Sequence, residues 1–164
     1  MTMDTHTLDL QQHYFKISRA LADYARCIDD DRLEEWPSFF VEDCLYKVTT
    51  ADNHRDGLEA GVMFANSRGM LTDRISALRQ ANIFERQSYR HLIGPPSILD
   101  FDNGVLRSEA AFMVARIMRD GTTMLFATGR YLDVWRDEGD ALRIKERIVV
   151  CDSSRVDTLM AIPL

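Results

Sequence analysis

The sequence lacks the cysteine and histidine pairs that metal-cluster redox sites require. Its three cysteines, Cys27, Cys44 and Cys151, lie far apart, and no histidine stands two positions after any of them. A Rieske cluster needs two Cys-x-His motifs, so the chain has no motif for one. An odd number of scattered cysteines also predicts no disulfide framework and indicates a reducing, cytoplasmic compartment. We interpret all three as small buried hydrophobic residues.

Other absences exclude further classes of protein. The apolar runs fall well short of the roughly 20 residues that cross a bilayer, and the first nine residues do not resemble a signal peptide. The formal net charge is -6, with both signs mixed along the chain. We therefore expect neither a membrane nor a nucleic acid as partner. The glycine-rich nucleotide-binding motifs and the serine-hydrolase motif are missing as well.

What is present predicts one folded domain over residues 1–164, because no linker, repeat or low-complexity segment divides the chain. Six apolar residues recur at steps of three and four and predict a first helix: Leu10, Tyr14, Ile17, Leu21, Tyr24 and Ile28. A second helix is expected through Leu33 and Trp36, followed by a strand over 44–50 and a polar loop over 51–57. The segment 58–66 fits either a helix or a strand, and a third helix is expected over 70–80.

The second half has the pattern of a meander of long antiparallel strands. Turn signals at 102–104, 119–121 and 137–140 divide it into four segments, and Pro95-Pro96 should bend the first of them. In the last strand, alternation predicts an apolar face and a mostly cationic face: Leu142, Ile144, Ile148 and Val150 against Arg143, Lys145, Arg147 and Val149. Helices followed by a meander predict an α+β fold with helices packed on a curved, mainly antiparallel sheet.

Two kinds of catalytic site can be weighed from the residues. An iron site with two histidines and a carboxylate would need His54 and His91 to converge, which the sequence leaves open. A small α+β cone could also use a buried aspartate as a base, with tyrosines as hydrogen-bond donors. The candidates are Asp23, Asp43 and Asp73 with Tyr14, Tyr24 and Tyr46. Asp23 and Asp43 are more simply read as a surface charge and a turn or cap residue.

The segment Tyr89-Arg90-His91 places a phenol, a guanidinium and an imidazole at the start of an apolar strand. Tyrosine and arginine are enriched at the centres of protein interfaces. We interpret these three residues as candidates for contact with a partner protein. The alternative is an ion pair within the chain, from Arg90 to Glu85 or Asp100.

Several stretches together resemble the small (β) subunits of Rieske-type aromatic-ring-hydroxylating dioxygenases. The resemblance covers nearly the whole chain and rests on these segments: Ile28-Asp29-Asp30-Asp31-Arg32-Leu33-Glu34-Glu35-Trp36, Phe39-Phe40, Asp43-Cys44-Leu45-Tyr46-Lys47-Val48, Met70-Leu71-Thr72-Asp73-Arg74-Ile75, Tyr89-Arg90-His91-Leu92-Ile93-Gly94 and the tail from Val150 to Leu164. Within the family, the chain is most similar to subunits of aromatic-acid systems, those for terephthalate and salicylate, with benzoate systems more distant.

The resemblance implies a cone-shaped fold like that of nuclear transport factor two and ketosteroid isomerase. It also implies an α3β3 assembly whose large subunit carries the Rieske [2Fe-2S] cluster and the mononuclear non-haem iron, with no cofactor, metal or catalytic residue in this chain. The chain alone could form a homotrimer. The expected function is therefore that of a non-catalytic structural subunit in the cis-dihydroxylation of an aromatic carboxylate. The alternative is a stand-alone isomerase or dehydratase of the same fold, which uses an Asp/Tyr pair in its pocket.

Overall fold

The computed structural model describes residues 5–59, 61–81, 86–139, 141–155, 160 and 162–164. Along the chain, the elements are α1 (Thr5–Asp29), the 3-10 helix η1 (Trp36–Phe39), β1 (Phe40–Thr50), α2 (Ala51–Arg55), β2 (Met63–Ala65), α3 (Arg68–Gln80), β3 (Gln87–Ile93), β4 (Ser97–Asp102), β5 (Val105–Met118), β6 (Thr123–Asp137) and β7 (Leu142–Cys151). The predicted order of helices first and a long meander afterwards is confirmed.

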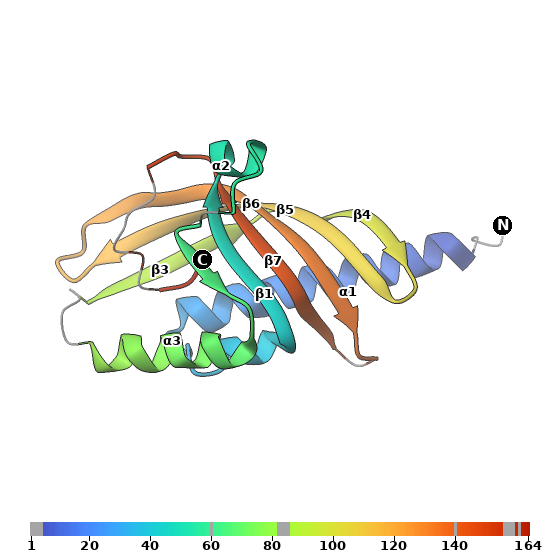
Figure 1. Cartoon of the computed structure of the whole chain (residues 1–164), viewed down its shortest axis with the longest axis horizontal. Helices are drawn as coiled ribbons and strands as arrows, with labels where there is room; N and C mark the ends of the chain where they lie inside the picture. The colour runs from blue at the N-terminus through green and yellow to red at the C-terminus, as the bar shows by residue number, and fades with distance from the viewer. Residues whose placement is uncertain (1–4, 60, 82–85, 140, 156–159, 161) are drawn as a thin grey trace.

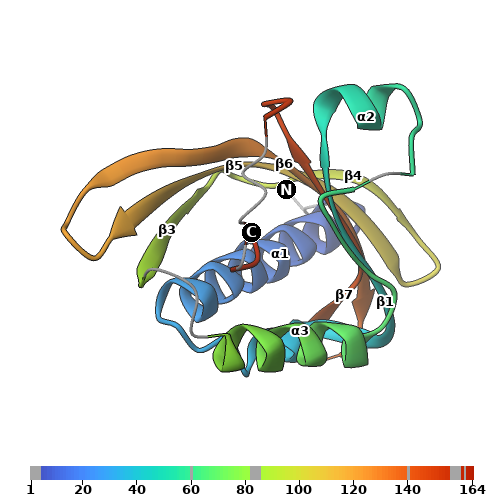
Figure 2. The ribbon, with the colours of Figure 1, turned by 60° about the vertical axis from the view of Figure 1, so that its left-hand side comes forward.

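The strands form a single curved sheet in the order β2-β1-β7-β6-β5-β3, with β4 also paired to β5. Every pairing is antiparallel except that of β1 with β7, which joins the first strand to the last in parallel. Helices α1 and α3 lie on one side of this sheet, so that sheet and helices enclose a cone (Figures 1 and 2). The α+β fold predicted from the sequence is confirmed, and the core lies inside the cone.

The turns of the meander form where the sequence predicts them. Asn103, Gly104, Gly121 and Gly139 all have positive φ angles, the conformation that tight hairpin turns demand. The segment with Pro95-Pro96 is bent as expected, because the two prolines separate β3 from β4 and both of these strands pair with β5. The first predicted segment is therefore two strands.

The apolar stripe of α1 packs onto the sheet over only part of its length. Ile17, Leu21, Tyr24 and Ile28 are at most 3% exposed, whereas Tyr14 is 37% exposed. The N-terminal end of α1 reaches past the strands in Figure 1. The helix is thus longer than the cone that its stripe covers.

Two predictions for the first half are corrected by the structure. The segment expected to be a loop contains the short helix α2, which begins because the Thr50 side chain accepts a hydrogen bond from the backbone N–H of Asn53. The helix expected through Leu33 and Trp36 is reduced to the single 3-10 turn η1, with Pro37 inside it. The ambiguous segment 58–66 contains the short strand β2.

The predicted faces of the last strand are wrong beyond Lys145. A β-bulge places Ile144 opposite Trp135 and Glu146 opposite Val134, so Lys145 has no partner in the ladder. One extra residue exchanges the two faces of a strand. Arg147 and Val149 therefore point into the cone and are fully buried.

Gly129 on β6 is the glycine where the sheet leaves least room for a side chain. A Cβ atom there would overlap the carbonyl oxygen of Val150 and lie 3.0 Å from the Cα of Cys151. We expect Gly129→Ala to lower the free energy of unfolding by about 1–3 kcal/mol, because backbone atoms cannot move aside cheaply. Urea unfolding followed by circular dichroism measures this. The matched change Gly69→Ala, whose Cβ would meet only Ser67 Oγ at 3.8 Å, should be neutral or stabilise by about 0.5 kcal/mol. Equal effects of both changes would contradict the prediction.

Candidate functional site

The centre of the cone holds a buried ion pair between β6 and β7. Arg147 Nε and Nη2 each donate to one oxygen of Asp133 at 2.7 Å, and both side chains are 0% exposed. Burial alone lowers the pKa of the Arg147 guanidinium, but the charge and hydrogen bonds of Asp133 raise it overall. Arg147 is therefore a permanent cation, and both oxygens of Asp133 accept hydrogen bonds from it.

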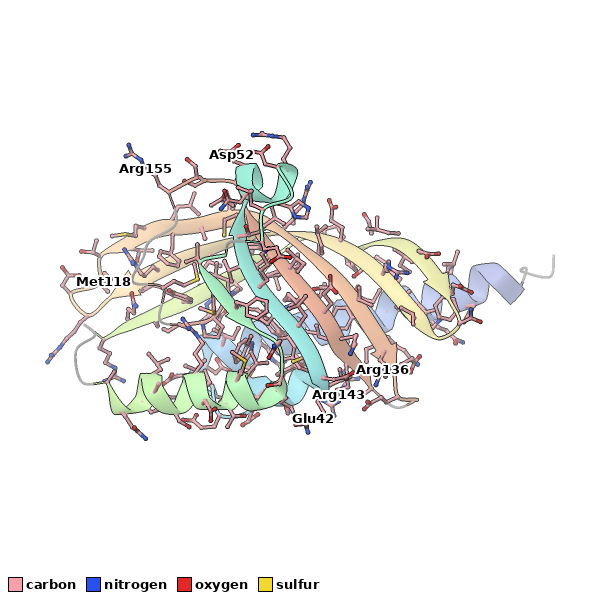
Figure 3. The ribbon with its side chains drawn as sticks, in the orientation of Figure 1. Glu42, Asp52, Met118, Arg136, Arg143 and Arg155 are labelled. Atoms are coloured by element: carbon pink, nitrogen blue, oxygen red, sulfur yellow. The ribbon has the colours of Figure 1, made fainter. Side chains whose placement is uncertain are left out.

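Aromatic rings enclose this ion pair. The Arg147 guanidinium carbon lies 4.2 Å from the ring centroids of both Tyr24 and Tyr131, which come from α1 and β6. Trp135 stands on the same face of β6, and its indole N–H donates to Ser108 at 2.8 Å. Side chains fill the space between the sheet and the helices (Figure 3).

The last residue of the printed sequence also lies inside the cone, in both views of the ribbon (Figures 1 and 2). Leu164 is 0% exposed. Its main-chain oxygen accepts hydrogen bonds from the hydroxyls of Tyr24 at 2.7 Å and Tyr46 at 3.0 Å. Burial raises the pKa of both phenols, so they remain protonated donors at neutral pH.

The carboxylates that the sequence offers as pocket bases do not lie in the cone. Asp23 pairs with Arg19 and Arg26 on the outside of α1. Asp43 is exposed, and the hydrogen bond from Lys145 holds its pKa below the ordinary value. Asp73 is exposed on α3.

The candidate tyrosines divide between surface and core. Tyr24 and Tyr46 are core residues, while Tyr14 is partly exposed. The buried carboxylate that sequence reasoning missed is Asp133. Strand alternation could have revealed it, because Asp133 lies two residues from both Tyr131 and Trp135 and therefore points to the same face of β6.

The segment Tyr89-Arg90-His91 lies on β3, beside the end of α1. Tyr89 and His91 point inward and are at most 7% exposed, whereas the Arg90 side chain is 66% exposed. Asp29, the last residue of α1, connects the helix to β3. Its carboxylate accepts a hydrogen bond from the backbone N–H of His91 at 2.9 Å, and one of its oxygens lies 2.6 Å from His91 Nδ1. Arg90 Nη1 lies 3.6 Å from the same carboxylate. Among the three residues, Arg90 is thus the one whose side chain is open to a partner.

The ion-pair alternative for Arg90 is realised with Asp29 instead of Asp100, which pairs with Arg107. Glu85, the other residue considered, lies outside the described residues. Beside this pair, an open groove of about 440 Å³ runs between α1 and β3, with Arg26, Asp29 and Arg90 at its charged end. The groove is a surface feature, separate from the filled cone.

The outer face of the sheet exposes apolar residues around Arg90. Leu92 and Met113 stand side by side on β3 and β5, and Leu125 of β6 pairs with Ala115, the neighbour of Arg90. Leu92 and Leu125 are 67% and 64% exposed. We call Arg90, Leu92, Met113 and Leu125 the outer patch. Contiguous exposed apolar surface of this kind marks sites of protein interaction.

Within the described ranges, no group of three or more histidine, cysteine, aspartate or glutamate side chains is placed to hold a metal ion. His54 lies on α2 and His91 on β3. Helix α2 packs beside β1 and β7, and at least two strands of the sheet separate these from β3. The two histidines that an iron site would need are therefore not brought together.

All three cysteines are free and buried, as the sequence predicts. Burial raises the pKa of Cys27 and Cys151 to about 11 and that of Cys44 above its ordinary value. We expect Ellman's reagent at pH 8 to label Cys27 and Cys151 at least about a hundredfold more slowly than free cysteine, because little thiolate is present. Cys44 should also react more slowly than free cysteine. All three should react once the chain is denatured. Ser76→Cys, on the exposed side of α3, provides the reactive control. Fast labelling of a native thiol would contradict this expectation.

None of the helices, over the residues that the structure describes, is long and apolar enough to cross a membrane.

Comparison with known proteins gives the chain its relatives. A family model described as "Ring hydroxylating beta subunit" matches residues 24–158. The chain is 54% identical over 143 residues to the terephthalate 1,2-dioxygenase terminal oxygenase component subunit beta 1 of Comamonas sp., covering 87% of this chain and 93% of that one. It is 35% identical to the anthranilate 1,2-dioxygenase small subunit of Burkholderia cepacia, covering 99% of this chain and 100% of that one.

A solved structure agrees with these sequence relatives. It is a beta subunit from Novosphingobium aromaticivorans, whose assignment to an aromatic-ring-hydroxylating dioxygenase is itself provisional. That structure superposes with a TM-score of 0.88 at 40% identity, over 94% of this chain and 99% of its own. The chain therefore belongs to the family of ring-hydroxylating dioxygenase beta subunits, as its sequence motifs predict.

Proposed function

We propose that this chain is the non-catalytic small subunit of a dioxygenase that cis-dihydroxylates an aromatic carboxylate of the terephthalate or benzoate type. The identity of 54% to a terephthalate dioxygenase subunit supports this substrate class. The large subunit would supply the Rieske cluster and the mononuclear iron, because this sequence has no Cys-x-His motif for such a cluster. Within the cytoplasm, residues 1–164 would serve as one supporting domain.

One observation carries this proposal: the place where an enzyme of this cone shape would bind its substrate is filled. Tyr24, Tyr46, Arg147 and Leu164 occupy the interior and are each at most 2% exposed. The alternative of a stand-alone isomerase or dehydratase has one feature in its favour, the buried carboxylate of Asp133. Burial raises its pKa, as a general base would need. Both of its oxygens, however, accept hydrogen bonds from Arg147 and the pair is fully buried, so Asp133 is held by a permanent cation and is closed to a substrate in this structure.

We further propose an α3β3 assembly in which the outer patch contacts the large subunit. A partner that binds only the folded chain stabilises it by mass action. The patch offers an exposed cation, Arg90, amid apolar side chains, which is the composition of many interface centres. Copies of the chain alone could form the trimer on which the large subunits assemble.

The test is to purify the chain alone and together with its large subunit, supplied with the matching reductase. We expect product from terephthalate, benzoate or salicylate only when the large subunit is present, and iron only in the complex. Light scattering of the complex should give a mass of three subunits of each kind. Stoichiometric iron in the isolated chain, or turnover by it, would refute the proposed function.

A further inference from the structure

Inside the cone, two phenol donors converge on a single main-chain acceptor. The hydroxyls of Tyr24 and Tyr46 both donate to the main-chain oxygen of Leu164. Tyr46 also accepts from the backbone N–H of Leu164 at 3.1 Å, so both main-chain groups of one residue are recognised. Each carboxylate oxygen of Asp133 already accepts one hydrogen bond from Arg147. Leu164 thus supplies the acceptor on which the phenols converge.

Three further polar atoms of the core are buried and have no hydrogen-bond partner among the described residues: Trp36 Nε1, Arg147 Nη1 and Tyr131 Oη. They belong to the same cluster of side chains. The Trp36 and Tyr46 rings lie 5.2 Å apart, and Arg147 lies against both Tyr24 and Tyr131. Burial raises the pKa of Tyr24, and the positive charge of Arg147 opposes that rise. Leaving such donors unpaired is costly, so this interior favours a group rich in acceptors.

A carboxylate matches this need. Its two oxygens offer about four acceptor positions, and hydrogen bonds to an ionised oxygen are the stronger kind. The surrounding aromatic and aliphatic walls require that the rest of the molecule be apolar. Leu164 itself combines such parts, since it presents an oxygen to two phenols and is otherwise an apolar side chain with no exposed surface.

We propose that the interior of the cone is a binding site for a small apolar carboxylic acid, held closed in this structure by Leu164 as an internal ligand. The site goes beyond the supporting role proposed above and does not depend on the large subunit. A molecule can enter it only when Leu164 is displaced. The chemistry is shared by aliphatic and aromatic acids, so both are needed as probes.

The experiment compares the full chain with a variant lacking residues 163–164, by thermal unfolding and by the fluorescence of Trp36 and Trp135. N-acetyl-leucine joins the side chain of Leu164 to a carboxylate, benzoate tests an aromatic acid, and benzyl alcohol is the neutral analogue. We expect each acid, at about ten times its Kd, to raise the Tm of the shortened chain by at least ~3 °C. The Tm of the full chain should not change. Adding Tyr24→Phe to the shortened chain should weaken binding of the acids about tenfold.

Leu106→Ala is the matched control for a vacated core position. Leu106 lies on β5 and is 1% exposed. It pairs with Trp135 of β6, in the same stretch of β5 in which Ala110 pairs with Tyr131. Its variant should gain no stability from either acid. If the shortened chain does not fold in the absence of a ligand, its refolding yield with and without N-acetyl-leucine gives the same comparison. The proposal fails if neither acid acts, if benzyl alcohol acts equally, or if Tyr24→Phe leaves the affinity unchanged. Stabilisation by N-acetyl-leucine alone would restrict the site to acids that resemble Leu164.

Discussion

Replacing Arg147 by methionine is expected to lower the free energy of unfolding by about 3–5 kcal/mol, because it strands the carboxylate of Asp133 in a dry interior. Both partners are 0% exposed, so water cannot compensate for the lost hydrogen bonds. A loss of this size is a large fraction of the stability of a typical domain. Urea unfolding at neutral pH, followed by tryptophan fluorescence, measures it.

The double variant Asp133→Leu with Arg147→Met separates the cost of a stranded charge from that of lost packing. A buried ion pair can often be replaced by apolar residues at little cost. We therefore expect the double variant to recover most of the stability that Arg147→Met loses, apart from the contact of the guanidinium with Tyr24 and Tyr131. The control is Arg136→Met, at an exposed position of β6, the strand that carries Asp133. It should change the free energy of unfolding by no more than about 0.5 kcal/mol. A double variant as unstable as the single one would show that the charges are not the cause.

The ion pair also shows where reasoning from the sequence stops. Local patterns predicted the first and third helices and every turn of the meander, because helix periodicity and Asn-Gly or Asp-Gly turns act over a few residues. The bulge at Lys145 lies instead where β7 pairs on one side with β6 and on the other with β1, a strand from the far end of the chain. Strict alternation placed Arg147 outside, and a single extra residue moves it to the centre.

The candidate site was predictable to a similar extent. Composition alone singles out the motif around Arg90, but the direction of each side chain depends on the strand. Alternation along β3 turns Tyr89 and His91 inward, where Asp29 binds the histidine, and leaves Arg90 outside. Asp29 is 62 residues away from His91, so no local pattern could pair them. Family membership was recognisable because it rests on many short segments at once.

Introducing a charge into the outer patch should separate assembly from folding. Leu92→Asp and Leu125→Asp change side chains that are more than half exposed, so each should alter the stability of the isolated chain by no more than about 0.5 kcal/mol. If the patch forms the centre of the contact with the large subunit, an unpaired aspartate there costs about 2 kcal/mol or more, which is at least a thirtyfold loss of affinity. Titration of the large subunit with each variant, followed by analytical ultracentrifugation, measures this loss.

The control for these variants is Ser76→Asp, at an exposed position on α3, on the side of the sheet opposite the outer patch (Figure 2). It should bind the large subunit as the unchanged chain does. Arg90→Met adds a second test, because removing the cation leaves the apolar surface intact and should slow association, most clearly at low salt. Unchanged affinity in both aspartate variants would remove the outer patch from the interface. Loss of self-association with normal binding of the large subunit would assign the patch to contacts between copies of this chain, because the same apolar surface cannot be buried against both partners at once.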